Sequence, residues 1–272
     1  MKFAIINDTH VSSPDTGYEK GIQRKLVGKS EKLIQNFVHE MNETEKPAFV
    51  VHLGDLIEDV GDKDKDMYYL KKTVSLLSGL KPKIYFLIGN HDVKTNSAGE
   101  LAQIFGYKKM YYSWDYDDYH FVALSFERDM DEKSPSYGTT HLTEEETKWL
   151  KADLAKTQKP TIIFSHYGLA DDDMAGNFWF ENIPDRAVLS GKAKIRKIFE
   201  DSGKVKAVIS AHQHWNRMFV HDGIPYITVT SLVENFHNDG EAAEARTIVN
   251  LDKNNLSVAV KGNDPANYKF EF

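Results

Sequence analysis

The 272-residue sequence contains no cysteine, and this absence excludes several kinds of chemistry. Disulfide bonds, thiolate nucleophiles and iron–sulfur clusters all need cysteine, and so does a cysteine-rich structural zinc site. No apolar stretch approaches the roughly 18–20 residues that a membrane-spanning helix needs, and the apolar start MKFAIIND ends too early for a secretory signal. We therefore expect a cytoplasmic protein that does not bind membranes.

The sequence also lacks an excess of positive charge. It has 34 Lys and Arg residues against 41 Asp and Glu residues, which gives a formal net charge of −7. Because surfaces that bind long nucleic acids are usually basic, we expect no long nucleic acid among the ligands. A small anionic substrate remains compatible with this charge if bound metal ions supply the local positive charge. Repeats, low-complexity segments and composition breaks are absent as well, which predicts a single domain over residues 1–272.

The N-terminal part of the chain alternates between short apolar runs and stretches in which apolar residues recur at helical spacing. The apolar runs occur at residues 2–6, 48–53 and 84–88, and the helical stretches lie between them at 33–41 and 67–77. Because strands that alternate with helices usually pair in parallel, this order predicts a parallel sheet with helices on its faces.

The rest of the chain predicts more strands and two more helices. Thr143 and Glu146 predict a capping box at the start of one helix, and the other is predicted at 192–199. The predicted strands are 111–114, 120–125, 161–164 and 205–209, followed by antiparallel strands from 217 to about 261. Together these patterns predict an α/β fold, a four-layer α-β-β-α sandwich of two mixed sheets flanked by helices.

Five polar clusters each follow directly after a predicted strand. In open α/β sheets, the crevice beyond the carboxyl ends of the strands is the usual ligand site, so these clusters can meet at one place. In an extended backbone, residues two apart point the same way, as predicted for Asp8 with His10 and for His212 with His214. The clusters are Asp8-Thr9-His10, Gly54-Asp55, Gly89-Asn90-His91-Asp92, Ser165-His166 and His212-Gln213-His214.

The residue types in these clusters predict a metal centre. Imidazole nitrogens together with carboxylate or amide oxygens suit first-row ions such as manganese, iron, zinc or cobalt. Seven candidate ligands are too many for one tetrahedral ion, but they fit two ions that share a bridging carboxylate. These candidates are Asp8, His10, Asp55, Asn90, His166, His212 and His214.

A pair of ions about 3.5–4 Å apart is the arrangement used for in-line displacement at phosphorus. The ions lower the pKa of a bound water, so that metal-bound hydroxide acts as the nucleophile, and they neutralise charge on the phosphoryl oxygens. The leaving oxygen needs a proton, and His91 is a suitable acid next to the candidate ligand Asn90. Asp92 is the predicted partner that holds the imidazole ring of His91, so both residues are candidate catalytic residues. The alternative for Asp92 is a purely structural role in the turn.

The ordered motifs D-x-H, G-D, G-N-H-D, a single H and H-x-H resemble those of the calcineurin-like metallophosphoesterases. The length and the hairpin and helix before His166 look most like one branch of this family. That branch contains bacterial cyclic-nucleotide phosphodiesterases, glycerophosphodiesterases and manganese-dependent ADP-ribose/CDP-alcohol diphosphatases. The resemblance departs at Ala211, where the family usually has glycine, and at Asp92, where glutamate is frequent.

The resemblance implies how two divalent or mixed-valence transition-metal ions (Mn, Fe or Zn) are held. Asp55 would bridge the two ions, and His91 would contact the substrate phosphate and assist the leaving group. One ion would be held by Asp8, His10, Asp55 and His214, and the other by Asp55, Asn90, His166 and His212.

We therefore expect a dinuclear phosphodiesterase or diphosphatase that acts on a small phosphoester, with a nucleotide among the candidates. The alternatives are a phosphomonoesterase, including a protein phosphatase, and a non-catalytic scaffold with the same fold.

Two further features are left open. The aromatic run at 178–180 could stack on a nucleobase, fill the space under a loop or form a homodimer contact. Glu58 is interpreted as a neighbour of the ligands or a solvent-exposed residue rather than as a ligand.

Overall fold

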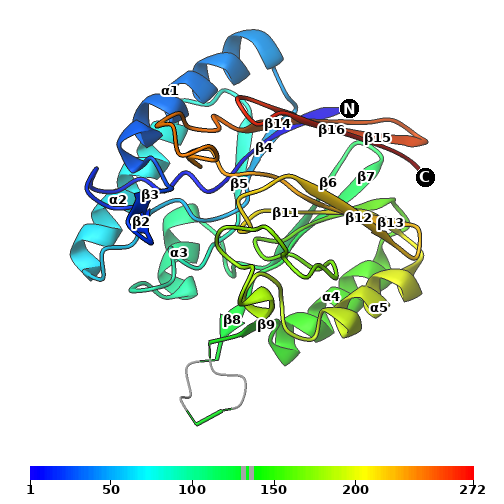
Figure 1. The fold of residues 1–272 in the computed structure, drawn as a ribbon. Coiled ribbons are helices and arrows are strands. Elements are labelled where there is room, and N and C mark those ends of the chain that lie inside the picture. The colour runs from blue at the N-terminus through cyan, green and yellow to red at the C-terminus, as the bar shows by residue number, and fades with distance from the viewer. Residues whose placement is uncertain (130–132, 135–137) are drawn as a thin grey trace. The chain divides into compact units, whose positions relative to one another are not determined.

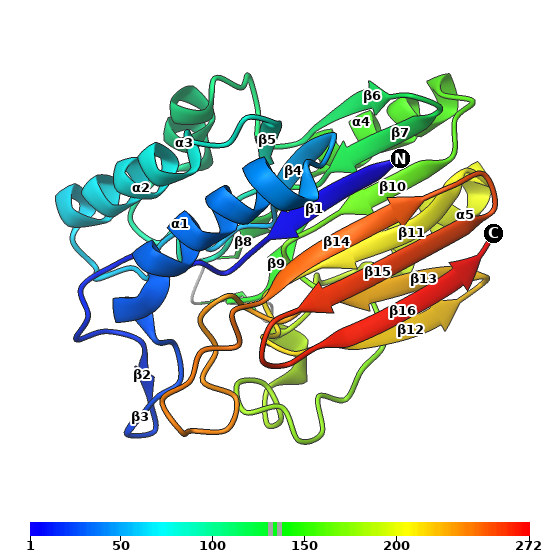
Figure 2. The same cartoon turned by 90° about the horizontal axis from the view of Figure 1, so that it is seen from above.

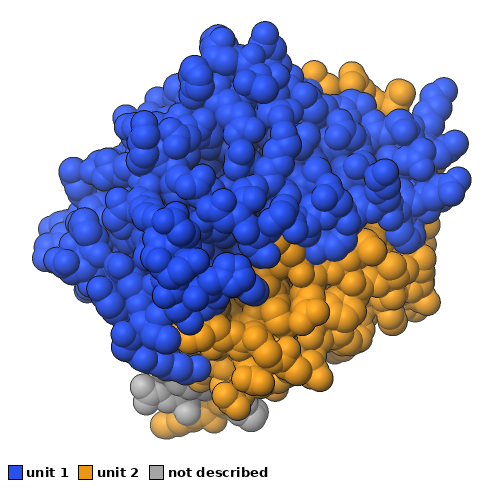
Figure 3. Space-filling model, turned by 45° about the horizontal axis from the view of Figure 1, so that its top comes forward, with its two compact units in different colours: residues 1–109, 229–272 blue, residues 110–228 orange. Residues whose placement is uncertain are grey.

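The computed structural model describes residues 1–129, 133–134 and 138–272. The chain forms two compact units, which Figure 3 shows in different colours. Unit 1 consists of residues 1–109 and 229–272, and unit 2 consists of residues 110–228. Unit 1 is thus built from two separate stretches of the chain. The prediction of a single domain over residues 1–272 stays a prediction.

Unit 1 is built on a six-stranded mixed sheet with the order β16-β15-β14-β1-β4-β5 (Figures 1 and 2). The N-terminal strands pair in parallel, as predicted, and are β1 (Lys2–Ile6), β4 (Phe49–His52) and β5 (Lys83–Phe86). The C-terminal strands pair antiparallel and are β14 (Arg246–Leu251), β15 (Asn255–Lys261) and β16 (Ala266–Glu271). Strand β16 lies beyond the region in which strands were predicted. The sequence did not indicate it because its residues are exposed or half-buried and form no buried apolar face.

The helices of unit 1 form where the sequence has an apolar stripe. In α1 the stripe of Leu33, Ile34 and Phe37 is buried. The sequence did not indicate α3, which has only eight residues, although Ser97 and Glu100 form a complete capping box at its start. The helices are α1 (Ser30–Glu40), α2 (Lys63–Leu77) and α3 (Ala98–Phe105), with short turns η1 (Val27–Lys29) and η2 (Met41–Glu45) and the small hairpin β2 (Tyr18–Glu19) and β3 (Ile22–Gln23).

Unit 2 contains a second six-stranded mixed sheet with the order β12-β13-β11-β10-β7-β6. Its four central strands are parallel and its two edge strands are antiparallel to their neighbours. The strands are β6 (Tyr112–Tyr116), β7 (Tyr119–Ala123), β10 (Thr161–Phe164), β11 (Val205–Ser210), β12 (Arg217–His221) and β13 (Ile224–Thr228), with a separate pair β8 (Glu127–Arg128) and β9 (Thr140–His141). Strand β13 is thus antiparallel to β12, as predicted, but parallel to β11.

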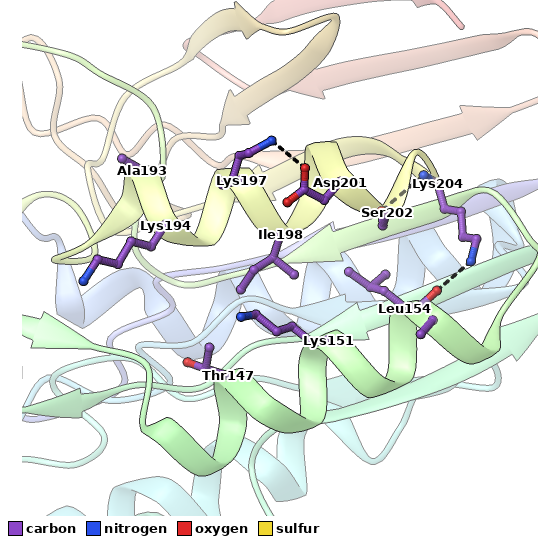
Figure 4. A pocket seen from close by; sticks show the side chains of 11 residues that line it. Thr147, Lys151, Leu154, Ala193, Lys194, Lys197, Ile198, Asp201, Ser202 and Lys204 are labelled. Atoms are coloured by element: carbon purple, nitrogen blue, oxygen red, sulfur yellow. Dashed lines mark hydrogen bonds and ion pairs between the residues drawn. The ribbon is translucent and has the colours of Figure 1, made fainter.

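Two helices of unit 2, α4 (Glu144–Lys156) and α5 (Lys192–Ser202), pack side by side, and a short turn η3 (Pro184–Arg186) precedes α5. A groove of about 950 Å³ lies between them. Lysine side chains are among those that line it (Figure 4). Half of the predicted capping box is wrong. Oγ1 of Thr143 accepts a hydrogen bond from the amide of Glu146, as predicted. The Glu146 carboxylate accepts from the amide of Ser125, whereas a complete capping box requires it to accept from the amide of Thr143.

The structure is a mixed α/β fold with two large mixed sheets flanked by helices, which confirms the predicted fold class. Among the described residues, no helix is both long and apolar enough to cross a membrane.

Candidate metal centre

Unit 1 gathers candidate ligands at the carboxyl ends of its parallel strands. Asp8 and His10 follow β1, Asp55 follows β4 and Asn90 follows β5, and these strands are neighbours in the sheet. One ligand atom from each of Asp8, His10 and Asp55 lies within 4.8 Å of the others, and all three residues are buried. Nε2 of His10 lies 3.8 Å from Oδ2 of Asp55. Unit 1 therefore brings three predicted ligands together.

Most of the predicted ligands have a left-handed backbone. The φ angles are +47° at Asp8, +45° at His10, +54° at Asp55, +67° at His212 and +54° at His214. Residues with a Cβ atom seldom adopt this region, and such strain clusters at functional sites. The extended backbone predicted for the two i, i+2 pairs is therefore wrong, because these residues lie in tight turns after the strands.

Two glycines allow the ends of β4 and β5 to approach closely. Gly54 has a φ of +100°, and a Cβ atom there would lie 2.6 Å from the amide nitrogen of Gly89. A Cβ atom on Gly89 would lie 2.1 Å from Oδ1 of Asp55. The same Oδ1 atom accepts a hydrogen bond of 2.9 Å from the amide of His91. Because neither glycine has a side chain, the backbone that follows β5 comes close enough to the loop after β4 to orient the carboxylate of Asp55.

Glu58 holds the ring of His10. Its Oε2 lies 2.9 Å from Nδ1 of His10, which leaves Nε2 on the side of Asp55. Burial, and then the positive charge of Lys25, lower the pKa of His10 to about 4. The ring is therefore neutral near pH 7, which is the form that binds a metal ion. A carboxylate behind a histidine orients the ring and raises its basicity toward a metal ion, so Glu58 fits a supporting role.

The ring of His91 is held by Asp59 rather than by Asp92. Nδ1 of His91 lies 2.6 Å from Oδ1 of Asp59. Asp92 is fully buried, and its carboxylate accepts hydrogen bonds of 2.8–3.2 Å from the amides of Leu56, Ile57 and Gly89. The expectation that Asp92 holds the ring is therefore wrong, because its side chain fixes the backbone after β4 and β5. Its place among the catalytic residues stays a prediction.

Carboxylates control the charge of His91. Burial and the cation Lys25 lower the pKa of the ring, but the nearby carboxylates, led by Glu58, raise it above its ordinary value. The protonated form of the ring is thus more stable than that of a histidine in water, which suits a proton donor. With Nδ1 held by Asp59, Nε2 is the nitrogen left to exchange a proton with a ligand, and Nζ of Lys25 lies 3.0 Å from it. An ammonium group can only donate, so Nε2 carries a proton only when Lys25 donates to another acceptor.

Unit 2 brings two predicted ligands together and places a third on the same loop. His166 follows β10, and His212 and His214 follow the neighbouring parallel strand β11. The rings of His166 and His212 have centroids 4.9 Å apart. Nε2 of His212 lies 3.0 Å from the carbonyl oxygen of Arg186, so Nδ1 is the nitrogen suited to a metal ion.

Ala211 occupies a position at which the family usually has glycine, but its backbone is not in the left-handed region that glycine would permit. The described residues with positive φ include His212 but not Ala211. The amide of Ala211 donates to the carbonyl oxygen of His166 at 3.0 Å. This hydrogen bond links the two histidine motifs of unit 2.

Aromatic rings surround the histidines of unit 2. Tyr167 and Phe180 lie 4.1 and 4.8 Å from the ring centroid of His212, and Trp179 lies 5.5 Å from that of His214. The buried side chain of Asn177 fixes this segment, since its Oδ1 accepts from the amides of Trp179 and Phe180 at 2.9 Å each. The aromatic run at 178–180 therefore lies beside predicted metal ligands.

The donors in each unit fit transition-metal ions by their chemistry. Among the predicted ligands, unit 1 offers buried carboxylate oxygens, the amide oxygen of Asn90 and one neutral imidazole, and unit 2 offers imidazoles alone. A model of the calcineurin-like phosphoesterases matches residues 1–216, which include all five motifs. The chain belongs to this family.

Several solved structures have a similar fold. A dimetal phosphatase from Danio rerio matches this phosphoesterase with a TM-score of 0.80 at 16% identity, over 100% of this chain and 98% of that chain. Purple acid phosphatase PPD1 from yellow lupin seeds matches with a TM-score of 0.66 at 14% identity, over 99% of this chain and 53% of that chain.

GAP50, the anchor in the inner membrane complex of Plasmodium, matches with a TM-score of 0.61 at 14% identity, over 100% of this chain and 89% of that chain. At these identities the likeness shows the fold of the phosphoesterase alone. No curated protein gives a significant match to the chain.

Proposed function

We propose that this calcineurin-like phosphoesterase hydrolyses phosphodiesters or diphosphates of small molecules with the help of two metal ions. The observation that carries the proposal is the paired arrangement around His91, whose ring contacts Asp59 while its amide donates to Asp55. This arrangement couples a proton donor to the predicted bridging ligand. A protein that only binds a partner need not keep this arrangement.

The predicted ligands of the two ions are divided between the two units. Unit 1 would supply the carboxylates, His10 and Asn90, and unit 2 would supply the three remaining histidines, with Asp55 as the bridge. When bound, the two ions would neutralise charge on the phosphoryl oxygens and acidify the attacking water. Manganese, iron and zinc all suit this donor set.

The chain's own residues have separate tasks in this reaction. Asp59 holds Nδ1 of His91, so that Nε2 presents a proton to the leaving oxygen. Glu58 orients His10, and the hydrogen bond from the His91 amide orients Asp55. Each of these contacts lies within unit 1 and is fixed before a substrate arrives, as electrostatic preorganisation requires.

The aromatic side chains of unit 2 favour a substrate with a flat ring. Trp179 is half-buried, and the hydrogen bonds from Asn177 keep its backbone rigid beside His214. A base that stacks on such a ring gains binding without sequence-specific contacts. This supports a nucleotide diester or diphosphate over an aliphatic ester.

The test is hydrolysis of bis(p-nitrophenyl) phosphate against p-nitrophenyl phosphate by metal-stripped protein with added manganese. We expect manganese-dependent turnover that favours the diester. A preference for the monoester would replace the proposal with a phosphomonoesterase. No turnover with manganese, zinc, iron or cobalt would contradict catalysis and favour a scaffold, the kind of role that the word anchor describes in GAP50.

A further inference from the structure

Lys25 is a buried cation that lies against the proposed proton donor. Its Nζ lies 2.6 Å from Oε2 of Glu58 and 3.0 Å from Nε2 of His91. Only 6% of its side chain is exposed. Lysine is almost never fully buried unless its charge has a partner or a task. Glu58 supplies a partner, but it does not explain why Lys25 reaches the one ring nitrogen that Asp59 leaves for chemistry.

The backbone around Lys25 is fixed by the C-terminal stretch of unit 1. The amide of Leu26 donates to the carbonyl oxygen of Val233 at 2.9 Å. On the other side, Nε of Arg24 donates to Oε1 of Glu234 at 2.7 Å. Both neighbours of Lys25 are thus anchored. Its side chain is held toward His91, so little conformational entropy is lost when it binds a ligand.

A buried ammonium group attracts anions and repels cations. Glu58, which contacts Lys25, also lies 2.9 Å from Nδ1 of the predicted metal ligand His10. Placing a cation here weakens the binding of metal ions to the same cluster. Its presence is therefore better explained by an anionic ligand. In a phosphoester hydrolase, that anion is the substrate.

We propose that Lys25 binds substrate by moving its hydrogen bond from Nε2 of His91 to the leaving oxygen, so that Nε2 can then carry the proton that His91 gives to the same oxygen. This inference rests on the proposed function. Water adds to phosphorus, the bond from phosphorus to the leaving oxygen breaks, and the Nε2 proton of His91 moves to that oxygen. One proton of the water stays on the phosphate, the other goes to solvent, and solvent returns a proton to His91. Lys25 keeps its own protons and stabilises the charge that develops on the leaving oxygen.

The experiment compares Lys25→Met with wild type on methyl p-nitrophenyl phosphate and methyl phenyl phosphate. Phenolate is the more basic leaving group, so its oxygen carries more charge that needs stabilising. We expect the loss in kcat/KM to be about 10- to 100-fold larger on the phenyl ester, as for a charged hydrogen bond made mainly in the transition state. Equal losses on both esters would overturn the proposal and leave Lys25 as the counter-ion of Glu58.

Lys29 is the matched control, because it lies in the same segment but is 43% exposed and pairs with Glu241 at the surface. We expect Lys29→Met to behave as wild type on both esters. The double variant Lys25→Met/Glu58→Gln removes the whole ion pair and guards against a folding defect in the single variant. Its reference is Glu58→Gln alone, because Glu58 also contacts His10 and His91. If pairing is the only role of Lys25, the double variant has the same ratio of the two rates as Glu58→Gln. If Lys25 binds the leaving oxygen, the altered ratio persists.

A binding measurement separates this inference from the proposed function. Manganese-loaded wild type and both single variants are titrated with inorganic phosphate by calorimetry, after their metal content has been measured. We expect Lys25→Met to bind phosphate about 10-fold more weakly at equal metal content, and Lys29→Met to bind it normally. Unchanged affinity in Lys25→Met would overturn the inference. Absent turnover in wild type would contradict the proposed function alone.

Discussion

Oδ1 of Asp59 lies 2.6 Å from Nδ1 of His91, so this aspartate fixes the tautomer of the candidate proton donor. Asp59 is four residues beyond the predicted bridging ligand Asp55 in the same loop after β4. One short segment therefore supplies a metal ligand and the residue that orients the acid. This arrangement makes the two functions depend on one backbone conformation.

Asp59→Asn and His91→Ala should each lower kcat by about 100-fold or more. Asparagine keeps the shape of the side chain but removes the charge that selects the tautomer and supports the protonated ring. Manganese content should stay at the wild-type value, since neither residue is a predicted ligand. The exposed Asp64→Asn on α2 is the control and should retain full activity. Wild-type kcat in either of the first two variants would remove that residue from the mechanism.

Gly89→Ala should disturb the metal centre more than its size suggests. The new Cβ atom would lie 2.1 Å from Oδ1 of Asp55, so the carboxylate and the loop must move. We expect a loss of about 1–3 kcal/mol in the free energy of unfolding, and weaker manganese binding measured by calorimetry. The matched control is Gly99→Ala in α3, where the new Cβ meets only Oγ of Ser97 at 3.9 Å. The control should be neutral or stabilising. Equal manganese affinity in Gly89→Ala and wild type would show that Asp55 tolerates the displacement.

Glu146 should make unit 2 less stable as the pH rises through neutrality. Burial, opposed in part by the hydrogen bond from the Ser125 amide, raises the pKa of Glu146 from 4.5 to about 7. The folded state thus binds the proton more tightly than the unfolded state. The resulting stabilisation is fully present below pH 4.5 and is lost as the pH rises through about 7. A shift of this size corresponds to at most about 3 kcal/mol.

Urea unfolding between pH 4.5 and 8 measures this effect. Glu146→Gln keeps an oxygen that accepts from Ser125 but cannot titrate, so its free energy of unfolding should fall less over this range than that of wild type. The exposed Glu144→Gln at the start of the same helix should keep the wild-type dependence. If Glu146→Gln follows the wild-type curve, Glu146 does not carry the raised pKa.

Trp179→Ala should raise KM for nucleotide diesters by about 10-fold, because a stacking surface for the base is lost. KM for glycerophosphocholine, which has no ring to stack, should change little. The exposed Tyr68→Ala on α2 controls for the loss of an aromatic ring elsewhere. A similar rise in KM for both substrates would point to a disturbed His214 rather than to lost stacking.

The sequence by itself determined the fold class and the positions of the motifs. Apolar runs and helical spacing located β1, β4 and β5 because burying apolar side chains dominates folding. The polar clusters then had to lie at the carboxyl ends of these strands. Short or half-exposed elements such as α3 and β16 were missed, since they carry little apolar pattern. The prediction of a complete capping box at Thr143 was wrong because the Glu146 carboxylate accepts a hydrogen bond from the distant amide of Ser125.

Only the tertiary structure decided which side chains surround His91. Nothing in the spacing of Lys25 and Asp59 marks them as neighbours of that ring, whereas Asp92, the next residue in the chain, was expected to hold it and does not. Lys25 reaches it because Leu26 pairs with the distant Val233, and Asp92 turns away because three buried backbone amides need an acceptor. Hydrogen bonds of buried groups are satisfied across the fold and not along the chain. The sequence can therefore name the residues of this site, but the packing of loops assigns their partners.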